Sequence, residues 1–574
     1  MGCQVDLLLP LLAQLVAPPL QNSPVRLPSP VLEAPAPGKG RPPTIQPQDF
    51  PAPEQAPPGP PAPAGSPSKP AAGLLPVIEG LTIYSPATAR AILAGCASIA
   101  DPKERLQACA TVLRQRLADD GYVNTRVTIS AAPAPGTIQV VEGRIAAITV
   151  TGPDARLNRR AQKLTHPLVN RVLHLPSLGR DLQLLRRQPG VGSIDAKLSR
   201  QGVDASRAVL VLSLKPGRRP WQGEVTLRND GTSGSGEARA VAVLSKPDLA
   251  TVGDTLLLYG ELDASDQPEL GSAISSISYT YPLADSLNLT GAFGFSRRNL
   301  VELDPPADGL SSSQYQGLVQ LEWVFSETLN RRWSVFTSYS GNRINQFLDD
   351  ATLPEDFFPE SVRTPRTGYL RLGLSGSELG QRAGWSGNAY LLQGIAAATP
   401  ANQRDELAAF AGIEPGKATA LGALLFGTWN FAPSWQVSAR LGGQWALNPL
   451  TSPMRFSLGS DVGLIGLPGQ LIDGDSGWLG TIEMAWTFWE SRRHANHALQ
   501  LVPFFGAGGV RTDLPGLTLT DTVGSGGLML RWLAGENWAV DLGWVGQFDT
   551  DDNSGVWNDW LLGSGLYAKV GFRF

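Results

Sequence analysis

Long apolar runs are missing from this 574-residue sequence, and cysteine is scarce. No stretch of about 18 or more consecutive apolar residues occurs, which argues against a transmembrane helix. A membrane β-barrel is still compatible with the sequence. Such a barrel spreads its lipid face over alternate residues and leaves the mean hydropathy near zero, here −0.07. The three cysteines exclude a disulfide-dense scaffold.

An excess of basic residues is missing as well. The formal net charge is −4, and 17% of the residues are charged. Chains that bind nucleic acid usually carry a basic surplus, because they must neutralise phosphates. We therefore expect no nucleic-acid partner.

Histidine is rare, with four residues in the chain. The run Gly474-Asp475-Ser476-Gly477 copies the nucleophile motif of trypsin-like proteases, but that chemistry needs a histidine base, and none stands in the expected context upstream. His494 and His497 lie in a polar connection between predicted strands, where a solvated turn is a simpler interpretation than a metal site. We expect no enzymatic activity, no catalytic residue, no metal and no cofactor.

The first 72 residues differ in composition from the rest. Residues 1–17 contain the apolar run Val5 to Ala17, which is too short to span a bilayer and resembles the core of a secretory signal peptide. Basic residues before this core are missing, so the segment is a signal-peptide remnant or something else. Residues 18–72 are rich in proline and alanine, cannot bury enough apolar surface to offset their ordering entropy, and predict a disordered, extended linker.

Residues 73–217 predict two α+β domains, at 73–147 and 148–217. Ser85-Pro86 and Asp101-Pro102 each place a helix cap before a proline, and Gly121 follows the second apolar helical stripe. Alternating apolar residues then predict two strands. The second domain repeats this order, so we expect strand, helix, helix, strand, strand in each.

Cys96 and Cys109 fall on the two predicted helices of the first domain. If the domain is exported, it matures in an oxidising compartment, where a disulfide can form. Closing a loop of this size would stabilise the domain by about 3 kcal/mol. Two small buried thiols are an equally weighted alternative.

Residues 218–574 have a β pattern throughout. All 15 tryptophans lie between Trp221 and Trp560, and two-residue alternation replaces helical periodicity. Many long strands, aromatic residues near strand ends and a terminal aromatic favour a membrane barrel over a large soluble sheet. At about 22 residues per strand with its connection, we expect about 16 antiparallel strands. The predicted C-terminal barrel signal is Val570, Phe572 and Phe574.

Several motifs resemble one family. Gly121-Tyr122-Val123-Asn124-Thr125-Arg126-Val127 and residues 136–145 resemble the first POTRA domain, of the ShlB type, of two-partner secretion transporters that secrete or activate haemolysins and haemagglutinins. Val225-Thr226-Leu227-Arg228-Asn229-Asp230-Gly231 is similar to that family's first barrel strand and turn. Gly253-Asp254-Thr255-Leu256 matches the start of the second strand. With Phe574, the resemblance covers most of the chain from residue 74 onward.

The resemblance implies a 16-stranded barrel in the bacterial outer membrane and two POTRA domains in the periplasm. It also implies export, without ATP, of an unfolded exoprotein of β-helical type, which would bind along POTRA edge strands by β-augmentation. Outer-membrane lipid and the barrel-assembly machinery would be further partners. One alternative is an assembly or insertion factor of the same superfamily, which tends to carry more than two POTRA domains. Another is a passive porin or adhesin, which leaves the α+β domains without a role.

One motif departs from the family. Its inward loop has a Val-Arg-Gly-aromatic tip, whose arginine pairs with an aspartate of the barrel wall. Here the tip is Leu464-Ile465-Gly466-Leu467, followed by Gly474, Asp475 and Gly477, and the wall motif is Phe504-Phe505-Gly506-Ala507-Gly508. Losing one partner would strand a buried charge at a cost of about 3–5 kcal/mol, whereas losing both can be nearly neutral. We expect apolar packing of Leu464, Ile465 and Leu467 against Phe504 and Phe505 instead.

Overall fold

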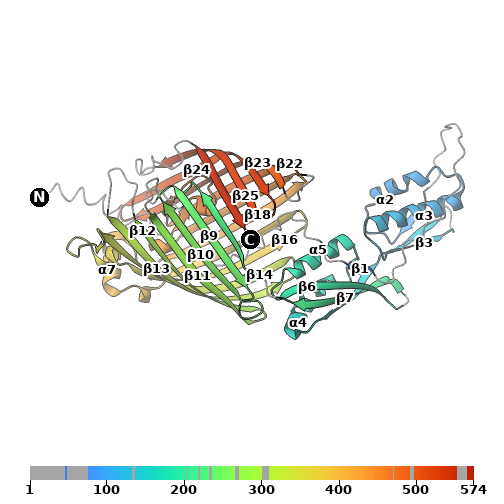
Figure 1. Ribbon diagram of the computed structural model, residues 1–574, viewed down its shortest axis with the longest axis horizontal. Coiled ribbons are helices and arrows are strands. Elements are labelled where there is room, and N and C mark those ends of the chain that lie inside the picture. Colours follow the sequence, from blue (N-terminus) through green and yellow to red (C-terminus); the bar gives the residue numbers. More distant parts are fainter. Residues whose placement is uncertain are drawn as a thin grey trace. The chain divides into compact units, whose positions relative to one another are not determined.

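The computed structural model describes most of the chain from residue 75 onward (Figure 1). The described residues are 45–47, 75–131, 136–202, 204–217, 220–231, 236–264, 270–299, 309–469, 471–491, 497–551 and 565–574. The predicted signal segment, His494 and the predicted linker, apart from residues 45–47, lie outside them. The chain divides into two compact units, one formed mainly by residues 39–218 and the other by residues 219–327 and 331–574.

The first α+β domain has the expected order of elements. Its three-stranded sheet has the order β2-β4-β3, with β2 parallel and β3 antiparallel to β4. The elements are β2 (Val77–Glu79), α2 (Pro86–Leu93), the 3-10 turn η1 (Ala94–Cys96), α3 (Pro102–Asp119), β3 (Arg126–Ser130) and β4 (Thr137–Val141).

Local sequence explains where these helices begin and end. The Ser85 hydroxyl accepts a hydrogen bond from the Thr88 N–H, and the Asp101 carboxylate accepts one from the Lys103 N–H, so both helices have the predicted N-caps. After α3 the backbone turns through Gly121, whose φ of +92° favours glycine. The helices pack on the sheet through a buried core that includes Leu93, Leu106, Leu113, Leu117, Ile138 and Val140 with the two cysteines.

The second α+β domain repeats the order with a longer sheet. Its elements are β5 (Arg144–Thr151), α4 (Ala155–Thr165), the 3-10 turn η2 (His166–Leu168), α5 (Leu175–Arg186), β6 (Val191–Gln201) and β7 (Asp204–Pro216). The sheet order is β1-β6-β7-β5, in which β1 (Ile45–Pro47) runs parallel to β6. Because β5 pairs with β7 from Arg144 onward, a boundary at residue 147 would cut a strand. We propose to place the boundary before Arg144.

Several contacts join the two α+β domains within the described residues, and three of them involve the segment that follows α3. The Asn124 amide donates a 3.0 Å hydrogen bond to the Ser206 carbonyl, and the Leu175 N–H donates one of 3.1 Å to the Gly121 carbonyl. The rings of Tyr122 and His174 stack with their centroids 4.7 Å apart. The segment that follows α3 therefore helps to link the two domains.

Sixteen strands form a closed antiparallel barrel in the described part of the chain, as predicted. They are β8 (Gln222–Arg228), β9 (Ala238–Pro247), β10 (Thr255–Ala264), β11 (Leu270–Ala284), β12 (Leu287–Asn299), β13 (Leu310–Glu327), β14 (Arg331–Leu348), β16 (Arg366–Leu379), β17 (Ala383–Gly394), β18 (Thr419–Ala432), β19 (Trp435–Ala446), β22 (Ser476–Glu490), β23 (His497–Leu514), β24 (Leu517–Ala534), β25 (Trp538–Asp551) and β26 (Leu566–Arg573). A short strand, β15 (Ala351–Thr352), pairs with β14. The ring closes where β26 pairs with β8.

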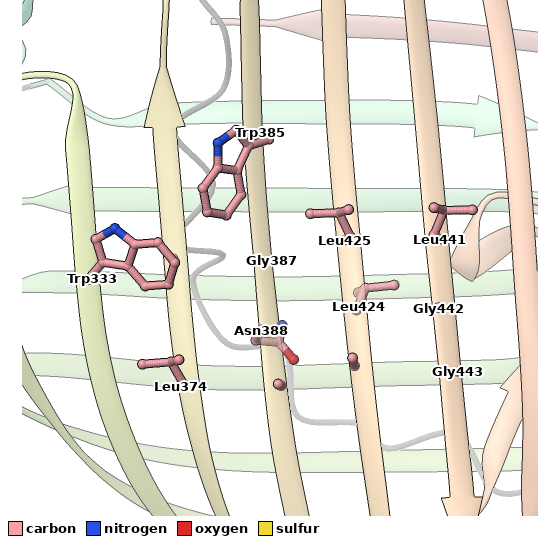
Figure 2. A pocket seen from close by; sticks show the side chains of 13 residues that line it. Trp333, Leu374, Trp385, Gly387, Asn388, Leu424, Leu425, Leu441, Gly442 and Gly443 are labelled. Carbon is pink, nitrogen blue, oxygen red and sulfur yellow. The ribbon is translucent and has the colours of Figure 1, made fainter.

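The inner and outer faces of the barrel differ in polarity, as expected for a barrel in a membrane. On β13, Gln314 and Gln316 are 2% and 1% exposed, whereas Tyr315 between them is 41% exposed and Trp323 is 55% exposed. Polar residues therefore face the lumen and large apolar residues face outward. An apolar hollow of about 400 Å³ is lined by residues of β14, β16, β17, β18 and β19. Figure 2 shows glycines among the larger side chains of this lining. The labelled walls include Trp333, Leu374, Trp385, Leu425 and Leu441.

Two helices interrupt the β pattern of the second unit. They are α6 (Glu360–Arg363) and α7 (Ala401–Ala411), and they lie in connections between barrel strands. The Gln403 side chain of α7 accepts a hydrogen bond from the Arg366 N–H and donates one to the Thr364 carbonyl, which fixes the two connections together. Alternation alone did not predict these helices. No helix in the described residues is long and apolar enough to cross a bilayer.

Candidate functional site: the inward loop of the barrel

The connection between β19 and β22 folds into the barrel. It contains the 3-10 turns η4 (Ser452–Met454) and η5 (Ser460–Val462), and the strands β20 (Phe456–Leu458) and β21 (Ile472–Gly474), which pair with each other. Its side chains and backbone contact lumen-facing residues of β8, β9, β22, β23 and β25. We call the described part of residues 447–475 the inward loop.

Asp475 fixes the base of the inward loop. Its carboxylate is 1% exposed and accepts hydrogen bonds from the backbone N–H groups of Leu450 at 3.0 Å and Asp513 at 3.1 Å. Arg455 Nε lies 3.4 Å from Asp475 Oδ1. Two glycines leave room for packing there. A Cβ atom at Gly474 would lie 2.8 Å from Val510 Cβ, and one at Gly477 would overlap the Phe456 ring. The residues of the protease-like motif, Gly474, Asp475 and Gly477, therefore make contacts that hold the loop.

Leucines fill the space that wall glycines leave near the tip. A Cβ atom at Gly506 would lie 2.9 Å from Leu464 Cδ2, and one at Gly508 would lie 2.7 Å from Leu458 Cδ2. Leu464 and Leu467 are fully buried in a cluster with Leu458, Leu471, Ile472, Leu479, Val510 and Val523. The wall motif therefore meets the loop through its inward-facing glycines.

The remaining tip residues lie against other parts of the wall. Ile465 packs against a buried cluster that includes Phe504, Val502 and Tyr567. The Gly466 carbonyl accepts a 2.5 Å hydrogen bond from the Gln547 amide of β25. Phe505, which we expected beside the tip, is 52% exposed and faces outward, because neighbouring residues of a strand point to opposite faces.

An ion-pair cluster at the start of the tip was not predicted from the sequence. Asp461 Oδ1 lies 2.6 Å from Arg239 Nη2 and 3.4 Å from Arg228 Nη2. Arg239 also contacts Glu261 at 2.7 Å and Asp263 at 3.7 Å, both on the neighbouring strand β10. The sequence signal was present, since Arg239, Glu261 and Asp263 occupy inward positions of paired strands. The partner in the loop is 222 residues away from Arg239, which local patterns cannot reveal.

The C-terminal residues close the barrel. Phe574 exchanges two backbone hydrogen bonds of 3.0 Å with Gly223, and a Cβ atom at Gly223 would overlap the Phe574 ring. The Phe572 ring lies 4.7 Å from that of Trp538 and 6.0 Å from that of Phe574, measured between centroids. Val570 pairs in register with Val540 of β25 and Leu227 of β8.

Cys96 of η1 and Cys109 of α3 form a disulfide in the structure, with their Cα atoms 5.4 Å apart. Both residues are buried, with 3% and 0% of their surface exposed. The bridge ties the segment after α2 to the middle of α3 and so fixes the helical layer of the first α+β domain.

Comparisons with known proteins agree with this architecture. The model of the family described as haemolysin secretion/activation protein ShlB/FhaC/HecB matches residues 207–520, more than half of the chain. The fold is similar to that of CdiB from Escherichia coli, at a TM-score of 0.53 and 16% identity over 90% of this chain and 93% of that one. CdiB from Acinetobacter baumannii gives a TM-score of 0.49 at 16% identity, over 99% of this chain and 97% of that one. No match is found among curated proteins.

The family match covers most of the barrel and includes the whole inward loop. The structure independently supplies a closed barrel with a polar lumen and an apolar outer face. As the sequence motifs predicted, the chain belongs to the haemolysin secretion/activation family ShlB/FhaC/HecB and is an outer-membrane transporter of a two-partner secretion system.

Proposed function

We propose that this chain binds an unfolded secreted exoprotein along the edge strands of its two periplasmic POTRA domains and translocates it through the barrel lumen without ATP. The domains would span residues 73–143 and 144–217. The client would be of β-helical type, the barrel would sit in outer-membrane lipid, and its insertion would need the barrel-assembly machinery. None of these steps requires a catalytic residue, a metal or a cofactor.

The main support for this binding mechanism is the pairing of β1 with β6. In the structure, β1 pairs parallel with β6, so that Ile45 lies opposite Ala196 and Pro47 opposite Leu198. This side of β6 therefore accepts an extended segment, even one that contains proline, by main-chain pairing, and a client would take the place of β1 there. An unfolded client presents the same backbone groups, which supports β-augmentation without strict sequence demands.

The first domain offers two further edges. Its sheet ends in β2 on one side and β3 on the other. Val77 of β2 and Ile129 of β3 are 51% and 43% exposed. Exposed apolar residues beside unpaired backbone groups favour the pairing of an incoming strand.

The lumen suits passage of a chain that has no fixed structure. Its lining is rich in small hydroxyl and amide side chains, including Ser276, Ser278, Ser312, Gln316 and Ser338. Such groups exchange hydrogen bonds with a polar backbone without offering a deep apolar trap. The outer membrane has no nucleotide supply, so folding of the client outside would drive its transport.

A site-specific crosslink tests the binding mechanism. Lys197 is exposed on β6, in the segment that β1 pairs with, and Arg159 is exposed on the helix α4, outside the sheet. A photo-crosslinking amino acid at Lys197 should capture the client during secretion, while the same group at Arg159 should not. Equal capture at both positions, or none at Lys197, would reject the β6 edge as a binding site.

A deletion tests the role of the two domains. Removing residues 75–216 should abolish secretion of the client while ion conductance in planar bilayers remains, because the closed barrel does not include those residues. Normal secretion by the deletion variant would show that the domains are not needed for client binding.

A further inference from the structure

We propose that Asp461 of the inward loop, with Arg239 and Arg228 of the barrel wall, forms a releasable latch that holds the loop across the lumen until a client passes. We call these three residues the latch. The inference deepens the transport function proposed above and rests on it.

The latch geometry is specific. One oxygen of Asp461 lies 2.6 Å from Arg239 Nη2 and 3.4 Å from Arg228 Nη2, so the carboxylate bridges two arginines of adjacent strands. Arg239 pairs directly with Arg228 in the β8–β9 register. Two cations on cross-strand neighbours repel each other, and a carboxylate between them relieves that repulsion.

Burial strengthens the ion pair between Asp461 and Arg239. The side chains of Arg239 and Asp461 are 1% and 9% exposed, so water screens their interaction poorly. The loop backbone also closes over Arg239, since a Cβ atom at Gly469 would overlap its guanidinium. An exposed ion pair would contribute little, but a buried one with good geometry can couple strongly.

The two wall arginines keep other acidic partners when the loop is released. Arg239 keeps Glu261 at 2.7 Å and Asp263 at 3.7 Å, and Arg228 keeps Asp230 at 2.9 Å. Withdrawal of Asp461 therefore leaves neither arginine as an uncompensated buried charge, which would be strongly unfavourable. Asp461 itself would move into the hydrated pore. This arrangement fits a contact that opens and closes better than a permanent anchor.

The latch also explains the apolar tip. In the pattern given above, the loop supplies the cation and the wall supplies the acid. Here the loop supplies the acid at Asp461, the wall supplies the cations on β8 and β9, and Ile465 lies in an apolar cluster instead. The charge pair has changed both its polarity and its place on the barrel wall.

Conductance of the purified full-length protein in planar bilayers tests the latch without any client. Asp461→Asn removes the charge but keeps the shape, and it should raise the time spent in open conductance levels several-fold. Asp461→Glu should behave like the wild type. Asp473→Asn is the matched control, because it removes one loop carboxylate whose partner Arg455 keeps Asp475, and it should leave conductance unchanged. If Asp461→Asn and Asp473→Asn behave alike, the latch is overturned.

A reversible crosslink tests whether the loop must move. Leu464 packs against Gly506, and the double variant Leu464→Cys, Gly506→Cys places two thiols at this contact. The change also removes Leu464 Cδ2, the atom that would collide with a side chain at position 506. Oxidation should block secretion, and a reductant should restore it. Normal secretion by the oxidised form would overturn release of the loop. Failure of the wild type to secrete any client would instead reject the proposed function, and the conductance comparison would still stand.

Discussion

At the residue scale, small wall residues and a few charges position the inward loop. Gly506 and Gly508 make room for two leucines, and Asp475 accepts hydrogen bonds from the backbone N–H groups of Leu450 in the loop and Asp513 in β23. A glycine in a barrel strand usually weakens that strand, because it has no side chain to pack. Here the loop provides the missing side chains.

A charge introduced at the tip should impair secretion. Ile465→Arg would bury a cation among apolar residues at a cost of about 3–5 kcal/mol to the docked loop. Gly506→Asp would push a carboxyl group against Leu464. Secretion assays should show a loss for each variant and a smaller loss than the sum for the double variant, because an arginine and an aspartate that meet in a buried site can couple by about 1.5 kcal/mol or more.

The control for this pair is Phe505→Leu, which changes an outward-facing residue and should secrete normally. Strictly additive losses in the double variant would show that the introduced side chains do not meet, since independent sites behave additively.

Removal of the disulfide should destabilise the first α+β domain. Cys96→Ser and Cys109→Ser together should lower the free energy of unfolding of this domain by about 3 kcal/mol, as expected from closure of a short loop. Chemical denaturation of the periplasmic part measures the difference. Mass spectrometry of the unreduced wild type is the companion measurement, and two free thiols there would disprove the bridge.

At the element scale, most strands and the capped helices could be predicted from the sequence. Alternation over the barrel reflects two chemically different solvents, so each strand carries its own signal. Caps such as Asp101 are equally local. The pairing of Ile45–Pro47 with β6 was not predicted, because a proline-rich context indicates the absence of regular structure and the pairing partner lies far along the chain.

The candidate site was predictable in part. The tip and wall motifs are located by their position in a family pattern, and the loss of that pattern's arginine and aspartate predicts an apolar contact between them. The replacement for the lost charge pair could not be found, because the chain brings Asp461 to Arg239 only when the barrel closes. The motif predicts Phe505 beside the tip, which is wrong, because Phe504, Gly506 and Gly508 take the inward positions of β23 and Phe505 faces outward.

The segment after α3 should be sensitive to a side chain at Gly121. The backbone there has a φ of +92°, and a Cβ atom would lie 2.7 Å from Pro176 Cδ of the second domain. Gly121→Val should therefore destabilise the joint between the domains by more than about 1 kcal/mol, and increase protease cleavage near residue 121. Gly179→Ala is a matched control, since nothing lies within 4 Å of its added methyl group. Equal resistance of both variants to protease would contradict a tight joint.

At the scale of the whole molecule, closure of the barrel depends on a short seam. β26 and β8 share five residue pairs, from Lys569 opposite Arg228 to Arg573 opposite Glu224, whereas β23 and β24 share eighteen. The backbone bonds between Phe574 and Gly223 extend this seam to the end of the chain.

A larger side chain at Gly223 should therefore disturb closure. Gly223→Val would overlap the Phe574 ring and separate the last backbone contacts of the seam. We expect less protein in the outer-membrane fraction and a weaker heat-dependent shift on gels. Gly260→Ala, in open space on β10, is the control and should fractionate like the wild type. A normal shift for Gly223→Val would mean that the seam tolerates displacement of Phe574.

The joint between the two α+β domains has a consequence for avidity. Because Asn124, Tyr122 and Gly121 hold one sheet to the other, a client that pairs with one edge is already tethered near the next. The second pairing is then intramolecular, with an effective concentration on the order of millimolar. Two weak backbone contacts can together retain a dilute exoprotein, yet each one breaks easily, so the chain can move from edge to edge without full release.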